Sequence, residues 1–420
     1  MKKLFRFCIT RLLVLRARRF LRQHHTQVIG ITGSIGKTST KQAIYTILSF
    51  GGGSVYASPE GFNTELGMSL AILQEEKSGF SSPLQWLKIL KRAFFSNKTP
   101  YQKMILEMGA DTPGDIARLF KIASPKIGVV TSVAPVHLDR GQFANIEAIA
   151  KEKSQLIARL PKDGVAILND DDLLVRQMKT EALRITYGIQ ASAMLRASDI
   201  TWTSKNLKFK VHYKGAVQDF EVPVLGAFQV YVLLPAIAVG LALGFSLEQC
   251  AMALTQFKLP PGRMNPLLGL NKSQIIDSSY NASPVTMTVA LDLLASLKAD
   301  RKIAALGTMN ELGEMSKEAH QTLGRQAAQI AQLLIAVGSE AATIKKGALE
   351  GGMPDGAIYT FFDSEEAGHF LKNQLQPKDL ALVKGSQNRV RMEKLVKVIM
   401  AEPQKAPKLL CRQGKEWEKI

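Results

Sequence analysis

Short apolar runs alternate with longer amphipathic stretches along most of this 420-residue chain. In the first half, the runs with the length of buried strands are Val28–Thr32, Lys103–Glu107, Ile127–Thr131 and Val165–Asn169. Stretches of helical periodicity between them are Lys37–Ser49, Gly114–Phe120 and Ile146–Leu160. Strands that alternate with helices in this way predict an α/β fold whose parallel, doubly wound sheet is covered on both faces.

The pattern changes between about residues 190 and 224, where short strands alternate with polar turns. The predicted strands there are Ile200–Trp202, Leu207–Tyr213 and Val217–Val222. They indicate a small antiparallel insert in the first domain. An apolar helix at Gln229–Leu243 and a shorter helix from Ser246 are expected to follow.

A Pro-Pro-Gly segment divides the chain. Residues Leu259 to Arg263 form the expected linker, with a hinge near Pro260–Arg263. Beyond it, strands are predicted at Gln274–Asp277, Lys302–Leu306, Leu333–Val337 and Leu380–Val383, and helices at Met287–Leu297, at Gln321–Gln332 and from Arg391. This renewed alternation predicts a second, Rossmann-like α/β domain over residues 261–400, after a central domain over 28–260 and before a tail over 401–420.

Residues 1–27 differ from both domains. Residues 1–24 contain eight lysines and arginines among apolar residues, with no acidic residue and no proline, which predicts a basic amphipathic helix. Its apolar stretch is short and interrupted by charges, and no small-residue cleavage site follows, so a secretory signal is not expected. Such a helix has three possible roles: attracting pyrophosphate, contacting an anionic membrane, or covering a face of the next domain.

Composition narrows the class of protein. The three cysteines, Cys8, Cys250 and Cys411, lie far apart, which is typical of a reducing cytoplasm and offers neither a disulfide framework nor metal-ligand spacing. A net charge of +18 favours anionic partners such as nucleotides, nucleic acid or an acidic membrane. Since the chain has no nucleic-acid-binding motif, a polyanion-binding protein is the weaker hypothesis and no nucleic-acid partner is expected.

The most specific motif is Thr32-Gly33-Ser34-Ile35-Gly36-Lys37-Thr38-Ser39, which follows a predicted strand and opens a predicted helix. Its glycines allow backbone N–H groups to turn toward phosphates, and the helix N-terminus favours negative charge. The lysine adds a positive charge, and the threonine hydroxyl suits Mg²⁺. Because Ile31 stands where the longer phosphate-loop pattern has its first glycine, this is a shorter variant, G-x-x-G-K-T.

This loop resembles the ATP-binding loop of the Mur ligases, the cytoplasmic enzymes that build the stem peptide of peptidoglycan. Further similar segments follow in order over roughly residues 28–400. They are Gly61–Gly67 (GFNTELG), Glu107–Ala110 (EMGA), Ala134–Asp139 (APVHLD), Ile149–Lys153 (IAKEK), Pro261–Met264 (PGRM), Asp277–Pro284 (DSSYNASP), Leu306–Glu314 (LGTMNELGE) and Lys384–Ser386 (KGS). The S-Y-N-A and M-x-E-L-G-E patterns are most similar to those of the member that adds D-alanyl-D-alanine.

The resemblance implies ATP-dependent formation of a peptide bond. A carboxylate takes the γ-phosphate of ATP to give an acyl phosphate, and an amine then displaces phosphate from it. The implied substrates are a UDP-muramoyl tripeptide and D-alanyl-D-alanine, and the implied enzyme is a cytoplasmic monomer. Two Mg²⁺ ions and a carbamylated Lys153 are also implied, since carbamylation turns a lysine into an anion that binds metal.

Site residues follow from the same alignment of motifs. The implied catalytic residues are Lys37, Glu107, His137 and Lys153, and the last three, with Thr38, would hold Mg²⁺. The residues expected at ATP are Gly33, Ser34, Gly36, Lys37, Thr38, Ser39, Gln229, Arg263 and Asp277. The residues expected at the other substrates are Asn63, Thr64, Tyr280, Asn281 and Lys384.

The chain departs from the family's pattern in three places. Only about 27 residues precede the first strand, so the domain that holds the UDP-sugar in full-length members is expected to be absent. The adenine-binding G-x-H-N-x-x-N helix reads Gly226-Ala227-Phe228-Gln229, where Gln229 would substitute and Phe228 would stack. Thr308 and Ser283 replace an aspartate and an asparagine near the expected acceptor.

These departures keep two alternatives open. One is a ligase that acts on a different carboxylate donor, such as a lipid-linked muramoyl compound. The other is a non-catalytic, ATP-binding scaffold for wall synthesis, against which the presence of Lys37, Glu107, His137 and Lys153 argues.

Overall fold

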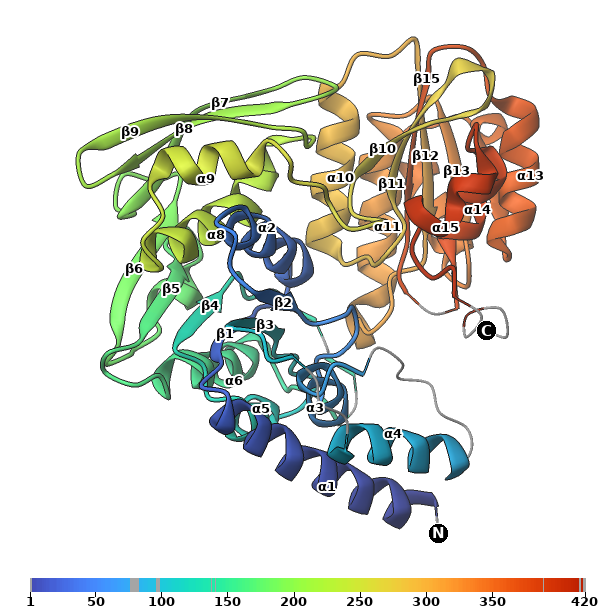
Figure 1. Cartoon of the computed structure of the whole chain (residues 1–420). Coiled ribbons are helices and arrows are strands. Elements are labelled where there is room, and N and C mark those ends of the chain that lie inside the picture. The colour runs from blue at the N-terminus through green and yellow to red at the C-terminus, as the bar shows by residue number, and fades with distance from the viewer. Residues whose placement is uncertain are drawn as a thin grey trace.

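The computed structural model describes residues 2–75, 83–95, 99–136, 138–139, 141–387, 389–414 and 417. They form two sheets joined by the segment around residues 259–264 (Figure 1). The first sheet has nine strands in the order β2-β3-β1-β4-β5-β6-β7-β8-β9, and the second has six in the order β10-β11-β15-β12-β13-β14. Within the described part of the chain, no helix has the length and apolar character needed to cross a membrane.

The first sheet is parallel from β2 to β7. Its strands are β1 (Gln27–Thr32), β2 (Val55–Ala57), β3 (Lys103–Glu107), β4 (Ile127–Val130), β5 (Val165–Asn169), β6 (Leu183–Gly188), β7 (Leu195–Trp202), β8 (Leu207–Tyr213) and β9 (Ala216–Val222). The predicted small antiparallel insert is present as strands β7–β9. Strand β7 pairs with β6 in parallel, at Tyr187 and Leu195, so β7–β9 extend the main sheet.

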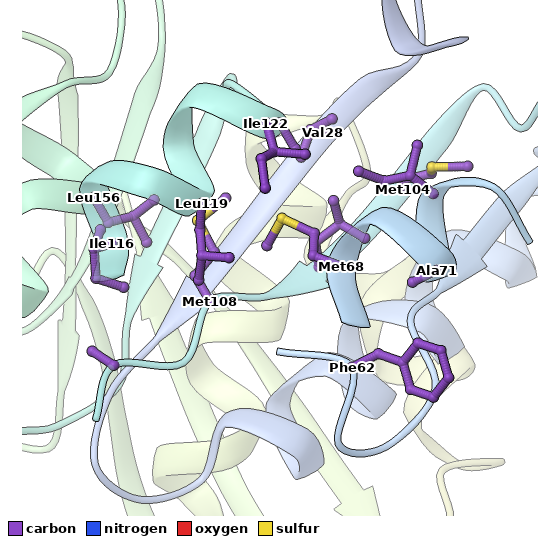
Figure 2. Close-up of a cluster of buried hydrophobic side chains, with 14 of the residues drawn as sticks. Val28, Phe62, Met68, Ala71, Met104, Met108, Ile116, Leu119, Ile122 and Leu156 are labelled. Atoms are coloured by element: carbon purple, nitrogen blue, oxygen red, sulfur yellow. The ribbon is translucent and has the colours of Figure 1, made fainter. Parts of the chain in front are cut away.

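Helices cover both faces of this sheet, as the alternating pattern predicted. One face carries α1 (Lys2–Gln23), α3 (Glu65–Ile72), α4 (Pro83–Phe95), α5 (Asp115–Ile122), α6 (Ile146–Ala158) and α7 (Leu173–Arg176). The opposite face carries α2 (Lys37–Phe50), α8 (Val230–Ala242) and α9 (Leu247–Leu254). Figure 2 shows the core on the first face, where Met68 of α3 and Leu119 of α5 meet Val28 of β1.

The second sheet is parallel except at its edge strand β10. Its strands are β10 (Asn265–Leu268), β11 (Gln274–Ser278), β12 (Arg301–Gly307), β13 (Leu333–Val337), β14 (Ile358–Phe361) and β15 (Asp379–Lys384). Its helices are α10 (Pro284–Ser296), α11 (Ser316–Ala328) and α12 (Ala341–Glu350) on one face, and α13 (Ser364–Gln374), α14 (Met392–Ile399) and α15 (Ala406–Leu409) on the other.

Two predictions in the second domain needed correction. Helix α11 begins and ends earlier than the predicted Gln321–Gln332, because Ile330 and Ala331 lie in the turn into β13 rather than on the helix. Strand β10, α12, β14 and α13 were not predicted at all. Strand β14 has only four residues and lies at the sheet edge, where the apolar signal is weak.

Candidate active site

The phosphate loop lies between β1 and α2, at the carboxyl edge of the first sheet. Gly36 has a φ of 86°, which favours glycine, and it caps the N-terminus of α2. A side chain on Gly33 would place Cβ 1.9 Å from the Thr131 hydroxyl of the neighbouring β4 loop. Both glycines are therefore required by geometry, and the loop lies directly against the end of β4.

Hydrogen bonds fix the rest of the loop. The Ser34 backbone N–H donates to the Ser132 carbonyl at 2.8 Å, and the Ser34 hydroxyl accepts from the Ala134 N–H at 3.0 Å. Lys37, the first residue of α2, donates from Nζ to the Gly33 carbonyl at 2.6 Å. Thr38 follows it and Ser39 is buried. The predicted loop residues are thus gathered around one helix N-terminus, which is a favourable place for phosphate.

Glu107, at the carboxyl end of β3, lies in the same site. Lys41, one helical turn after Lys37, places Nζ 2.7 Å from Glu107 Oε1, and each side chain is only 5% exposed. Burial raises the pKa of Glu107, but the charges of Lys41, Lys37 and Arg263 outweigh it and hold that pKa below its usual value. Glu107 is therefore an ionised carboxylate beside the phosphate loop.

Lys153 of α6 is buried beside this group. Burial lowers its pKa to about 7, and the positive charge of Lys37 adds to that effect. The preceding residue, Glu152, caps α5 instead, because its carboxylate accepts from the backbone N–H groups of Gly114 and Ile116, each at 2.8 Å. Burial lowers the pKa of Lys37 as well, while Glu107 raises it.

Asn63 and Thr64 border the site from the loop before α3. Asn63 accepts at its backbone carbonyl from Gly109 N–H at 3.1 Å, and a side chain on Gly109 would collide with the Asn63 amide. The Thr64 hydroxyl accepts from Gly67 N–H at 3.3 Å, as the N-cap of α3. Asn63 therefore lies over the Glu107–Ala110 segment, and Thr64 is engaged in helix capping.

From the second domain, Arg263 reaches across to the first. Its guanidinium pairs with Glu60 at 2.5 Å and lies 3.9 Å from the centroid of the Tyr280 ring. The charge of Arg263 also influences the pKa of Lys37 and of Glu107. The charge of the linker arginine therefore acts on the phosphate-loop lysine, and its predicted contact with ATP stays a prediction. Gly262 beside it has a φ of 74° and accepts from Tyr280 N–H at 3.1 Å.

Three motifs that are distant in sequence meet at the carboxyl edge of the second sheet. Lys384, at the end of β15, donates to the Ser278 hydroxyl at 3.1 Å and to the Asn281 carbonyl at 2.8 Å. The hydroxyl of Ser386 donates to the Ala282 carbonyl and accepts from Asn310 N–H. Burial lowers the pKa of Lys384 to about 7, and Arg263 lowers it further. This edge is where open α/β sheets bind ligands.

A C-terminal segment completes this edge and was missed in the sequence. Arg412 donates to the backbone carbonyls of Ser279 and Tyr280, and its guanidinium lies 4.9 Å from the Tyr280 ring centroid. Its charge is paired with Glu393 at 3.1 Å, and Glu393 is also paired with Arg391. The segment that holds Tyr280 is thus clamped between Arg263 and Arg412.

Two residues predicted to contact the nucleotide are buried. Gln229 lies in a short 3₁₀ turn before α8 and is 2% exposed. Asp277 is fully buried at the end of β11, where burial raises its pKa to about 6 and Oδ1 accepts from Ser279 N–H. Phe228 is partly buried and packs against the core of the second domain, and its stacking on adenine stays a prediction.

The two substitutions near the expected acceptor have local explanations. Ser283 is the N-cap of α10, and its backbone N–H donates to the Thr286 hydroxyl at 2.9 Å. The Thr308 hydroxyl accepts from Glu340 N–H at 3.1 Å and so joins the end of β12 to the start of α12. Both side chains therefore take part in contacts at the N-termini of helices.

His137 lies outside the described residues, so its predicted metal role stays a prediction. Two residues further on, Asp139 accepts at Oδ1 from Gly313 N–H of the second domain at 3.2 Å. The Ala134–Asp139 segment therefore adjoins the domain junction. Among the described residues, no group of three or more His, Cys, Asp or Glu side chains is arranged to hold a metal ion.

Sequence reasoning missed Lys41, Glu60 and Arg412. Lys41 follows Lys37 by four residues, which places both on one face of α2, so helical spacing offered a signal. Glu60 and Arg412 offered none, because their partners lie 203 and 132 residues away in the chain.

Comparison with known proteins agrees with this geometry. Residues 31–240 match the Mur ligase middle domain and residues 262–387 match the family described as Mur ligase, glutamate ligase domain. The UDP-N-acetylmuramoyl-tripeptide–D-alanyl-D-alanine ligase of Mycobacterium leprae is 33% identical over 390 residues, which cover 86% of this chain and 71% of that protein. The ligase of the same name from Bacillus subtilis is 27% identical, covering 92% and 79%.

Solved structures show the same relationship. MurF from Acinetobacter baumannii superposes with a TM-score of 0.76 at 26% identity, covering 93% of this chain and 79% of that one. The MurF ligase of Thermotoga maritima in complex with ADP gives a TM-score of 0.76 at 25% identity, covering 94% and 84%. The matched domains, the extent of these similarities and the shared fold together show that this chain belongs to the Mur ligase family.

Proposed function

We propose that this chain joins D-alanyl-D-alanine to a UDP-N-acetylmuramoyl tripeptide, with conversion of ATP to ADP and phosphate. The observation that carries the proposal is the meeting of two half-sites. Lys37, Glu107 and Lys153 lie together in the first domain, and the Arg263–Tyr280 pair faces them from the second. Similarity to D-alanyl-D-alanine ligases over most of the chain supports this choice of substrates.

The first step requires positive charge at the transferred phosphate. The tripeptide carboxylate attacks the γ-phosphorus, the bond to the β-phosphate oxygen breaks, and ADP leaves. Lys37 would neutralise charge on the β- and γ-phosphates, and N–H groups at the start of α2 would donate to them. Arg263 would add its charge from the opposite domain, at the position where its field already acts on Lys37.

The described residues fit Mg²⁺ as a companion of ATP. Glu107 is an ionised carboxylate and Thr38 a hydroxyl on the first turn of α2, which are the hard oxygen donors this ion prefers. A cluster of three acidic side chains is not needed, because nucleotide phosphates and water complete the coordination. When bound, the ion would neutralise charge that develops on phosphate oxygens. A second ion, with Glu107, His137 and the carbamate of Lys153, is part of the proposal.

The environment of Lys153 suits carbamylation. Its neutral amine would add to CO₂, forming an N–C bond and releasing a proton. With a pKa near 7, about half of the side chain is neutral at pH 7, whereas an ordinary lysine is almost fully protonated there. Burial, which lowers this pKa, therefore prepares the residue for the modification.

The second half-site would receive the dipeptide. Its amine attacks the acyl phosphate carbon, and phosphate leaves. Tyr280, Asn281 and Lys384 lie together at the edge of the second sheet and would position the dipeptide. The proposed division of labour gives ATP to residues 28–260 and the acceptor to residues 261–400, with movement near Pro260–Arg263 bringing them together. Closure would exclude water, which would otherwise hydrolyse the acyl phosphate.

Location and assembly complete the proposal. We place the enzyme in the cytoplasm, as a monomer, with peripheral contact to the anionic inner face of the membrane through residues 1–24. The basic helix predicted there is α1, and its buried side packs into the core of the first domain. It therefore covers a domain face and leaves its other side for such a contact.

Phosphate release by the purified chain tests the function. The assay contains ATP, Mg²⁺ and a UDP-muramoyl tripeptide, with and without D-alanyl-D-alanine. Release that depends on both substrates, with a product heavier by the dipeptide, is the expected result. Binding of ATP without release would reject this donor, and a lipid-linked muramoyl substrate would then be tested in the same assay. No release with either donor would favour a scaffold.

A further inference from the structure

Helix α1 has one side in the protein core. Its buried residues are Ile9, Leu13, Ala17, Phe20 and Leu21, each at most 8% exposed. They belong to the same cluster as Met68 and Leu119, part of which Figure 2 shows. Because α1 is held by this packing, its orientation is fixed and the opposite side faces outward permanently.

The outward side of α1 carries alternating apolar and basic residues. Phe7, Arg11, Leu15, Arg18 and Arg22 follow one another at intervals of three or four residues, which places them in one stripe. The side chain of Phe7 is 55% exposed and that of Leu15 is 61% exposed. Exposed large apolar side chains that share one face and are bordered by charged residues are typical of a contact surface.

A shallow hollow lies in this stripe. It has a volume of about 430 Å³ and is lined by Leu15, Arg18, Arg19, Arg22 and Gln23. Three guanidinium groups around one leucine offer hydrogen-bond donors for an anionic head group and an apolar contact beneath it. No acidic residue occurs in residues 1–24 to neutralise these charges.

Helix α4 extends the same surface. It lies beside α1 along the lower margin of the molecule as seen in Figure 1, and Arg16 Nε of α1 donates to the Ala93 carbonyl at 3.0 Å. Its exposed apolar residues are Leu87, Phe94 and Phe95, at 64%, 41% and 82%. Like α1 it contains no acidic residue, and it adds Lys88 and Lys91, while its Arg92 is paired with Glu75 at 2.7 Å.

We infer that α1 and α4 form one surface that docks on an anionic lipid bilayer, with the arginines of α1 at the head groups and Phe95 of α4 among the acyl chains. The inference deepens the proposed membrane contact by adding its second helix and its anchoring residue. Arginine at head groups and aromatic residues at the membrane boundary are the chemistry that holds interfacial helices. Two copies of this chain would repel one another here, because neither helix offers an acidic partner.

Sedimentation with vesicles tests the surface. The vesicles contain phosphatidylglycerol and phosphatidylcholine in equal parts, or phosphatidylcholine alone. Binding to the anionic vesicles and its loss in high salt are expected, since the charges act within a Debye length. The triple variant R18Q, R19Q and R22Q should lose about fivefold in affinity per arginine. A control with the same change in net charge replaces the exposed Lys162, Lys205 and Lys378 by glutamine and should bind like the wild type.

The aromatic anchor has a matched control. Phe95 and Phe362 are each 82% exposed, but Phe362 lies in the second domain. The variant F95S should lose affinity for anionic vesicles at moderate salt, and F362S should not. Equal binding by F95S and the wild type, equal binding to both vesicle types, or equal losses in the arginine and lysine triple variants would each overturn the inference. Binding to DNA but not to vesicles would also overturn it.

Ligase activity on soluble substrates separates this inference from the proposed function. The arginine triple variant and F95S should retain wild-type phosphate release, because neither helix contributes a residue to the candidate active site. A wild-type chain that binds vesicles but lacks ligase activity would reject the proposed function and leave the lipid surface standing.

Discussion

Glu107 of the first domain and Glu393 of the second are both buried near the candidate site, but the two carboxylates are held differently. Glu107 is paired with a single lysine, Lys41, and its charge also acts on Lys37 and Arg263. Glu393 is fully buried and paired with both Arg391 and Arg412. The Lys41 pair engages one oxygen of Glu107, which leaves capacity for a ligand, whereas each oxygen of Glu393 already has a guanidinium partner.

The difference separates a binding group from a clamp. Burying a charged group costs desolvation free energy. An ion pair offsets this cost only when the other hydrogen bonds of the charged group are also satisfied. Glu393 meets this condition within the protein. By holding Arg412, it also fixes the position of Tyr280. Glu107 would meet it fully only with a cation and phosphates present. The phosphate side is therefore prepared for a ligand, and the acceptor side is fixed in advance.

Loss of the loop lysine should have the largest effect. Replacing Lys37 by methionine removes the charge that faces the transferred phosphate, and we expect phosphate release to fall by about 10²- to 10³-fold. Because burial lowers the pKa of Lys37, its removal relieves a desolvation cost, and the free energy of unfolding should not fall. A steady-state assay and urea unfolding check both parts. Activity within a few-fold of wild type would remove Lys37 from the phosphate site.

Removing Lys41 tests whether Glu107, the proposed binding group, depends on its ion-pair partner. The variant Lys41→Met leaves Glu107 buried without its partner, which should lower the free energy of unfolding by about 3–5 kcal/mol. The double variant Lys41→Met, Glu107→Leu should regain much of that stability while remaining inactive. Urea unfolding measures both. A single variant as stable as the wild type would show that Glu107 does not depend on this pair.

Removing Arg412 tests the clamp. Because Glu393 keeps Arg391, the variant Arg412→Met should lower the free energy of unfolding by only about 2 kcal/mol. Arg412 holds the acceptor segment through the backbone carbonyls of Ser279 and Tyr280. We therefore expect a raised KM for D-alanyl-D-alanine and an unchanged KM for ATP. Equal changes in both KM values would contradict the assigned division between the two half-sites.

The smallest effect concerns pH. Since the pKa of Lys153 is about 7 instead of 10.5, the unfolded chain binds more protons between these values, and the free energy of unfolding should rise with pH across that window. Below pH 7 the folded chain bears the full free-energy cost of burying a protonated Lys153. Activity should likewise rise through pH 7 and increase with added bicarbonate at fixed pH. Lys153→Met should show a smaller rise of stability with pH, because Lys384 keeps its own contribution, and no response to bicarbonate. A wild type insensitive to bicarbonate after CO₂ removal would argue against the carbamate.

The phosphate side could be predicted from sequence because its parts are local. Gly33, Gly36 and Lys37 lie within five residues, and Glu107 ends a strand whose apolar pattern is unmistakable. On the acceptor side, the sequence identified the motifs but not the contacts between them. That Lys384 bonds to Ser278 and Asn281 follows from the pairing of β15 with β11, a contact between segments over 100 residues apart.

The missed features have physical reasons. Arg412 carries no motif, and its partners become neighbours only after the second sheet has formed. The continuation of the first sheet into β7–β9 depends on β6, where polar residues alternate with apolar ones instead of forming a continuous apolar run. The burial of Gln229 and Asp277 depends on how the domains pack, which periodicity does not report.

The clamp also sets an order of events during synthesis. Arg412 is added to the chain 132 residues after Tyr280. At an elongation rate of about 5–20 residues per second, roughly 7 to 26 seconds pass between the two. A nascent chain on the ribosome can thus complete its phosphate loop early, while the acceptor segment waits for an arginine that has not yet been translated.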